Sequence, residues 1–327
     1  MLQEKFVCVA LDARKERGEY KDADGDFVRA TSCVTVTASG SVAVVTANAK
    51  ALGPYSGPGV GMEKWLYGKL KEWDALPAAE RKPGGVTVPK PEKVDPKRAA
   101  LALPADALVV RVFNRHLGWN EDKSLRYAVA ADYLPGTGAV DAERYAMAQN
   151  DFMWIPREEW QALVPAQPRT NAVHPVPVSF ALRLFRFHLD PCRGFTEGTA
   201  FTNSKASAGQ LTLTVQTVTE TTLSLRLEGA AKLEQPGREG PATFEPALLG
   251  FLEYDRAQKI FTRFDLLALG TTVNLPTDAN GKVAFRKTPY PLGIAAELVA
   301  HPTTAERLHP RGARDNVAAY LEPKEKR

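Results

Sequence analysis

A series of strand-like runs between residues 211 and 299 constrains this chain more than any other feature of its sequence. In residues 211–216 (LTLTVQ) and 223–228 (LSLRLE), every second side chain is apolar and the side chains between them are polar. That period is typical of a β-sheet with one solvated face. The stretch between the two runs, residues 219–222, is short enough for a hairpin turn.

The same reasoning predicts a second hairpin further along the chain. Residues 248–254 and 261–269 are strand-like, and the polar stretch 255–259 joins them. The run 291–299 could complete the set. Neighbouring strands with short links favour an antiparallel meander or half-barrel over parallel crossovers. We therefore expect an α+β protein whose larger C-terminal domain is an antiparallel β-sheet or half-barrel carrying one or two helices.

The chain divides into three parts by composition. Residues 1–80 predict strands at 6–12, 34–36 and 42–45, the last two as a hairpin around Ser39 and Gly40, followed by a helix. That helix is indicated by the spacing of Met62, Leu66, Leu70 and Trp73. Residues 81–104 are rich in Pro and Lys and predict an extended linker. Residues 105–323 predict the β-rich domain, beginning with a strand at 108–113.

Two helices are predicted within the β-rich domain. Residues 156–163 begin with Pro and carry acids in the first turn, as helix N-termini do. Residues 178–189 fit either period, and counting favours a helix. Its expected apolar stripe is Val178, Ala181, Leu182, Phe185, His188 and Leu189, and its expected polar stripe is Ser179, Arg183, Arg186 and Asp190. A strand would instead bury Arg183 beside Phe185 and Phe187, which is costly unless the arginine is paired.

Bulk properties exclude some classes of function. The 327 residues are 44% hydrophobic, and the net charge of +4 comes from 42 basic and 38 acidic residues. A surface so evenly charged argues against a nucleic-acid partner. No apolar run is long enough to span a membrane, so we expect a soluble protein without a transmembrane segment. No signal peptide is visible, so we expect a cytoplasmic location by default, or the cell envelope if the start is truncated.

No motif predicts a metal or another cofactor. His116, His174, His188, His301 and His309 lack the spacing of metal-binding histidines. Residues 21–26 (KDADGD) resemble the start of a calcium loop, but the glycine comes too early, and a plain Asp-Gly turn is the better interpretation. Residues 57–61 (GPGVG) lack the lysine of a phosphate-binding loop and are interpreted as a flexible connection.

The three cysteines, Cys8, Cys33 and Cys192, are too far apart for a C-x-x-C motif. Cys8 and Cys33 lie in apolar runs and are interpreted as small buried hydrophobes on strands. A disulfide between them across adjacent strands is the alternative.

The densest group of reactive side chains lies at residues 188–193 (HLDPCR), just after Arg183 and Arg186 of the expected helix. The arginines suit carboxylate or phosphate groups, and this predicts a site for a small anionic ligand or an acidic partner. The predicted site residues are Arg183, Arg186, His188, Asp190 and Arg193. The alternatives are an ordinary helix end, or arginines that pair with sheet acids such as Glu253, Asp255 or Asp265.

Several patches resemble a poorly characterised group of bacterial proteins that have a thioredoxin-like N-terminal domain and a β-rich C-terminal domain. The patches are residues 6–9, 73–84, 186–190, 249–255 and 261–270. The resemblance implies that residues 1–80 correspond to the second half of the thioredoxin-like domain. The redox cysteine pair of such domains precedes the strand that Phe6 would begin, so this chain lacks it.

These patterns together predict a non-enzymatic binding or protein-interaction module, in which the sheet offers a concave face to a small ligand or a partner protein. The alternative is a relative of thiol-disulfide oxidoreductases that lacks its redox cysteine pair in this chain.

Overall fold

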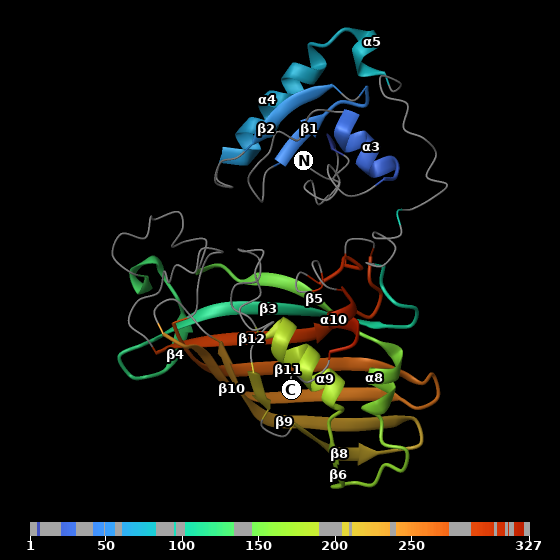
Figure 1. Ribbon diagram of the computed structural model, residues 1–327, viewed down its shortest axis with the longest axis vertical. Coiled ribbons are helices and arrows are strands. Elements are labelled where there is room, and N and C mark those ends of the chain that lie inside the picture. The colour runs from blue at the N-terminus through green and yellow to red at the C-terminus, as the bar shows by residue number, and fades with distance from the viewer. Residues whose placement is uncertain are drawn as a thin grey trace. The chain divides into compact units, whose positions relative to one another are not determined.

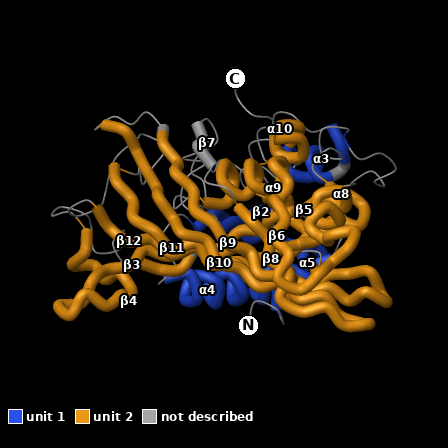
Figure 2. The backbone as a smooth tube through the Cα atoms, turned by 90° about the horizontal axis from the view of Figure 1, so that it is seen from below, with its two compact units in different colours: residues 1–100 blue, residues 101–327 orange. Residues whose placement is uncertain are grey.

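The chain forms two compact units, residues 1–100 and 101–327 (Figure 2). The computed structural model describes residues 5–6, 21–30, 42–48, 50–55, 61–82, 95, 102–133, 146–189, 205–208, 211–235, 240–274, 289–303, 306–310, 313 and 317–323. The predicted strands at 6–12 and 34–36 and all three cysteines lie outside these residues, apart from Phe6. None of the helices in the described part of the chain is long and apolar enough to span a bilayer.

The first unit contains a two-stranded antiparallel sheet and a helix. Strand β1 (Val42–Val45) pairs with β2 (Ala51–Tyr55), and the predicted helix is α4 (Met62–Asp74). The helix buries Leu66, and the Trp65 ring lies 5.2 Å from that of Tyr55 on β2. The predicted β1 strand and the α4 helix are thus present, whereas strand β2 was not predicted. A short helix, α5 (Ala78–Arg81), follows.

The predicted Asp-Gly turn at residues 21–26 is wrong. Helix α3 (Ala23–Ala30) begins there, with Gly25 inside its first turn. The Asp22 carboxylate accepts a hydrogen bond from the Gly25 backbone N–H (3.1 Å), which satisfies one of the donors that every helix N-terminus leaves open. Asp22 therefore serves as a helix-capping residue, a role that the turn interpretation missed.

The boundary between the units falls inside the stretch predicted to be a linker, but one described residue of that stretch is tied to the first unit. The Asp95 N–H donates to the Asp22 carboxylate (3.2 Å), and the Asp95 carboxylate accepts from the Lys21 N–H (2.9 Å). At Asp95 the chain is therefore hydrogen-bonded to the start of helix α3. Residues 83–94 and 96–101 lie outside the described residues, and their extended character stays a prediction.

The second unit is built on a large antiparallel sheet, which confirms the predicted α+β class. Its strands follow the order β4-β3-β12-β11-β10-β9-β8-β6 (Figure 1). Off this path, β5 also pairs with β3, and β7 pairs with β9. Their bounds are β3 Leu108–Trp119, β4 Leu125–Tyr127, β5 Gln149–Ile155, β6 Val173–Pro175, β7 Lys205–Ala208, β8 Thr212–Val218, β9 Thr222–Gln235, β10 Ala242–Asp255, β11 Ile260–Val273 and β12 Tyr290–Leu298.

Both predicted hairpins are present. Strands β8 and β9 join through residues 219–221, and β10 and β11 join through a turn at residues 256–259. In that second turn the Asp255 carboxylate accepts from the N–H groups of Ala257 (2.8 Å) and Gln258 (2.7 Å), and Lys259 adopts a left-handed conformation (φ 58°). An Asp at this position favours such a turn because its side chain bonds to the backbone two residues on.

Helices cover one face of the sheet, which we call the inner face. Helix α8 (Arg157–Ala162) and helix α9 (Val178–Arg183) lie in front of the strands in Figure 1. Trp160 of α8 stands edge-on to Phe261 at 6.1 Å, and Phe180 of α9 lies 6.0 Å from Phe264, so both helices pack on β11. The inner face is therefore filled by the chain's own helices and is not an open concave surface over these strands. A third helix, α10 (Val317–Leu321), was not predicted.

The predicted helix at residues 178–189 is present, but its last part is wider than an α-helix. Residues 184–188 form the π-helical turn η3 (Leu184–His188), closed by a hydrogen bond from the Leu189 N–H to the Leu184 carbonyl (3.0 Å). Side chains around this turn are buried on every side. Leu184 and Phe185 join the main core and Phe187 joins a second cluster with Trp154. The predicted polar stripe is therefore wrong, because Arg183 and Arg186 are buried while Val178 is exposed.

Candidate functional site

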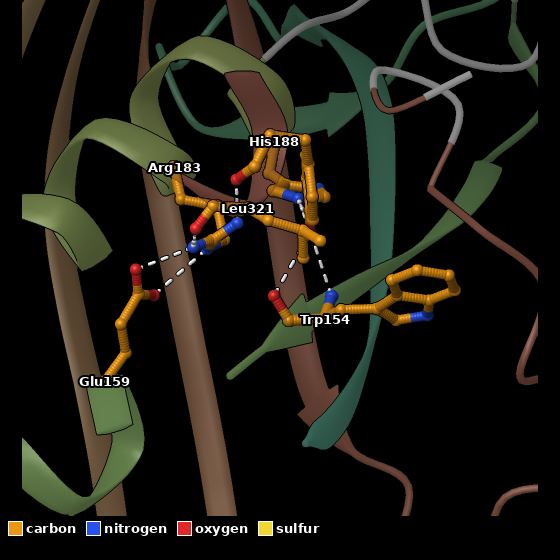
Figure 3. A network of polar contacts seen from close by, with 6 residues as sticks. Trp154, Glu159, Arg183, His188 and Leu321 are labelled. Atoms are coloured by element: carbon orange, nitrogen blue, oxygen red, sulfur yellow. Dashed lines mark hydrogen bonds and ion pairs between the residues drawn. The ribbon is translucent and has the colours of Figure 1, made fainter. Parts of the chain in front are cut away.

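Arg183 and Glu159 form a buried ion pair between α9 and α8 (Figure 3). The Arg183 side chain has no exposed surface. Its Nε donates to Glu159 Oε2 (3.0 Å) and its Nη2 donates to Glu159 Oε1 (2.6 Å). This two-pronged geometry matches the planar guanidinium to the carboxylate and offsets part of the cost of removing both charges from water.

The same guanidinium holds the end of helix α10. Arg183 Nη1 donates to the Tyr320 carbonyl, Nη2 donates to the Leu321 carbonyl (2.9 Å), and the guanidinium carbon lies 4.8 Å from the centre of the Tyr320 ring. The last carbonyls of a helix have no partner within it and carry partial negative charge. Arg183 thus satisfies these carbonyls from a position 137 residues earlier in the sequence.

The Tyr320 hydroxyl is the centre of a second set of buried contacts (Figure 3). It accepts from the Trp154 N–H (2.9 Å), donates to the Trp154 carbonyl (3.2 Å) and lies 2.9 Å from His188 Nε2. Trp154 belongs to β5, whose only strand partner among the described residues is β3. The hydroxyl therefore hydrogen-bonds to backbone groups that have no strand partner at the edge of the sheet.

Three of the five residues predicted to bind a ligand lie in the described part of the chain, and all three are buried. Arg183 and His188 are buried and fasten α8, α9, β5 and α10 together, and Arg186 is also buried. Asp190 and Arg193 lie outside the described residues, so the prediction of an anionic ligand at those two positions stays a prediction. An anion in solvent cannot reach Arg183 while this packing is intact.

The sheet acids considered as partners for the arginines have other contacts. Glu253 and Asp265 pair with Arg263, and Asp255 forms the β10–β11 turn. The true partner of Arg183, Glu159, stands in the first turn of α8. The sequence predicted Glu159 only as one of the acids in the first turn of a helix, so the pair with Arg183 was missed.

His116 is a buried histidine on the inner side of β3. Its Nδ1 lies 3.5 Å from the Tyr133 hydroxyl, and the Tyr290 ring stands edge-on at 5.9 Å. Burial lowers the pKa of His116 from 6.5 to about 3, because the charged imidazolium cannot be solvated there. His116 is thus neutral at physiological pH. Among the described residues no group of three or more His, Cys, Asp or Glu side chains could hold a metal ion.

The opposite side of the sheet carries a continuous set of apolar side chains on β10, β11, β12, β3 and β4. Register places Leu249 of β10 opposite Leu267 of β11, Leu267 opposite Ala295 of β12, and Ala295 opposite Phe113 of β3. Residues directly opposite in an antiparallel pair share a face. The set, here called the outer apolar face, consists of Phe113, Leu117, Trp119, Leu125, Tyr127, Ala247, Leu249, Phe251, Leu267, Leu269 and Ala295.

Much of this face is open to solvent. Leu267 is 46% exposed and Phe251 40%, while Trp119 and Tyr127, at the β3–β4 end, are 51% and 62% exposed. Of the thirteen large apolar side chains that are exposed in the described part of the chain, six belong to this face. Single exposed apolar residues are ordinary, whereas large contiguous apolar sets are uncommon on the surfaces of monomeric proteins.

Charged side chains on the flanks of the outer apolar face pair with one another. Arg226 lies 2.6 Å from Glu228, Lys232 lies 3.3 Å from Glu245, and Arg263 contacts both Asp265 (2.5 Å) and Glu253 (3.7 Å). The hydrogen bond to Asp265 raises the pKa of Arg263. The Arg115 guanidinium lies over the Tyr127 ring at 3.6 Å. Aromatic residues beside arginine are the types that contribute most to binding at protein interfaces.

The outer apolar face was not predicted, although the sequence carries a signal for it. Residues 247–252 (ALLGFL) and 266–269 (LLAL) are apolar at both odd and even positions. Such runs indicate strands that are covered on both faces. Strands β8 and β9, by contrast, alternate cleanly and have one polar face. Both runs were predicted as strands, without a prediction for their second face.

Comparisons of the chain with protein-family models, curated proteins and solved structures gave no match. The resemblance to proteins with a thioredoxin-like domain therefore stays a prediction.

Proposed function

We propose that this chain is a non-enzymatic protein-interaction module and that the outer apolar face is its docking surface. One observation carries the proposal: large apolar side chains on β10, β11, β3 and β4 are open to solvent on one face of a sheet whose other face is already packed. Covering such side chains is favourable by about 25 cal/mol for each Å² removed from water.

The ion pairs at the flanks support a protein partner over a charged polymer. A nucleic acid or an acidic surface would need an excess of unpaired basic groups, whereas Arg226, Lys232 and Arg263 each have an acid within 4 Å. An apolar centre with a polar, charge-balanced margin is the usual composition of a protein–protein interface.

Site-specific photocrosslinking in the cells that make the protein tests this proposal. A photoreactive phenylalanine analogue at Leu267 should give a discrete adduct on irradiation, and the adduct should disappear when Leu249→Glu is added. The matched control is the same analogue at Val173, which is 61% exposed but lies on β6 at the end of the sheet. Equal adducts from the analogue at Leu267 and at Val173 would refute the proposal. So would the absence of any adduct when the analogue is placed at Leu267 or at Phe251.

A further inference from the structure

We infer that the partner of the outer apolar face is a different protein that presents one acidic side chain among apolar ones, and that Arg115 binds this carboxylate. The inference rests on the proposed function, because it applies to a face that a protein covers, and it adds the chemistry of the partner. It follows from the place of Arg115 on the face, from the contacts of this arginine and from the cost of burying its charge.

Register places Arg115 inside the outer apolar face. Arg115 of β3 lies opposite Gly293 of β12. The same row continues through Leu269 of β11 and Ala247 of β10, so it holds no other charged side chain on these four strands. The next row, which begins at Phe113, is also apolar across the same strands. Arg115 is therefore a cation within the apolar set and not a member of the charged flanks.

Arg115 has no acidic partner among the described residues. Its guanidinium lies over the Tyr127 ring, and its Nε is buried without a hydrogen-bond partner in the part of the chain that the structure describes. The other basic side chains on this side of the sheet each lie within 3.3 Å of an acid, and they are Arg111, Arg226, Lys232 and Arg263. Within the described residues, Arg115 is thus the one basic group of this face whose charge the chain itself does not balance.

A partner that covers the face takes water away from this guanidinium. Removing water from a charge without supplying a counter-ion is strongly unfavourable, so the partner has to provide one. Stacking on Tyr127 occupies the flat side of the guanidinium and leaves N–H groups at its edge for a carboxylate. The buried Arg183 meets the same requirement inside the chain, where Glu159 neutralises it.

The number of unbalanced charges indicates the kind of partner. Nucleic acids bind through many phosphate contacts, and anionic bilayers bind through clusters of basic side chains. One unbalanced cation surrounded by apolar side chains instead fits one acidic side chain flanked by apolar residues. Arginine beside exposed aromatic residues, here Tyr127 and Trp119, is the composition found where protein interfaces are strongest.

Photocrosslinking from the analogue at Leu267, in cells whose chain also carries a substitution at Arg115, tests the inference. Arg115→Gln removes the charge, so the yield of the adduct should fall by about tenfold or more. Arg115→Lys keeps the charge without the two-pronged geometry and should retain part of the yield. The matched control is Arg157→Gln on α8, whose side chain is 56% exposed and lies off this face, and it should leave the yield unchanged. Melting temperatures of the purified variants show that each is folded.

Charge reversal then tests the contact itself. Mass spectrometry of the adduct locates the partner segment, which should contain an Asp or Glu between apolar residues. Replacing that acid by Arg should weaken the adduct, and combining the replacement with Arg115→Glu should restore it. An adduct of equal yield in the wild type and in Arg115→Gln would overturn the inference while leaving the proposed function standing, and so would an adduct between two copies of this chain. An adduct with a nucleic acid or a lipid, or no adduct from Leu267, would refute both.

Discussion

The Tyr320 hydroxyl binds both backbone groups of Trp154, accepting from its N–H at 2.9 Å and donating to its carbonyl at 3.2 Å. A side chain from the last helix thereby takes the place of a neighbouring strand along part of the edge of β5. The Nε2 atom of His188 lies 2.9 Å from the same hydroxyl, within hydrogen-bonding distance. The sheet edge and the C-terminal helix are thus stabilised by one buried group.

Tyr320→Phe is expected to lower the free energy of unfolding by about 1–3 kcal/mol, because it leaves the N–H and carbonyl of Trp154 buried without their partner. Urea denaturation measures the change. Tyr127→Phe is the control: its side chain is exposed, so the variant should stay within about 0.5 kcal/mol of the wild type. Equal effects from the two variants would contradict the role assigned to Tyr320.

Glu159→Gln is expected to lower the free energy of unfolding by about 3–5 kcal/mol, since it leaves the Arg183 charge buried without a counter-ion. Thermal and urea denaturation measure the effect. The matched control is Asp106→Asn, which breaks the exposed pair between Asp106 and Arg157 and should cost less than about 1 kcal/mol. A small loss from Glu159→Gln would mean that Arg183 finds water or another acid.

Acid is expected to destabilise the second unit through His116. Its pKa is about 3 in the folded chain and near 6.5 when exposed, so between these values the unfolded state binds more protons than the folded state. Stability from this group is therefore present above pH 6.5 and is lost as the pH falls, by about 1.4 kcal/mol for each pH unit.

Unfolding experiments between pH 7 and pH 4 measure that slope. His116→Asn should reduce it by the contribution of one proton, whereas Tyr133→Phe, which alters the neighbour but keeps the imidazole, should retain it. An unchanged slope in His116→Asn would show that other groups account for the acid sensitivity.

Lys259→Gly is expected to stabilise the β10–β11 hairpin by up to about 1 kcal/mol, because a left-handed conformation costs an L-residue roughly that much and costs glycine little. Gln258→Gly, at the preceding turn position, should lower stability instead, since it only adds freedom to the unfolded chain. The melting temperatures of the two variants should therefore move in opposite directions.

The sequence alone determined the fold class, because strand periodicity is a local property. The alternation at residues 211–216 and 223–228 and the polar links at 219–222 and 255–259 predicted β8 to β11 and both hairpins, and all are present. Helix α4 and the helix at residues 178–189 were also recognised from spacing. Short elements with weak patterns, such as β2 (Ala51–Tyr55) and β4 (Leu125–Tyr127), were missed.

Only the tertiary structure decided what the polar residues do. Periodicity placed Arg183 on a polar stripe, but its partner Glu159 lies 24 residues earlier and the carbonyls of α10 lie about 137 residues later. No local pattern relates positions so far apart. Desolvation of a charge is favourable only when such partners meet, so the burial of Arg183 depends on the packing of α8, α9 and α10 around it. The outer apolar face likewise became visible only when register joined Leu249, Leu267, Ala295 and Phe113 into one row.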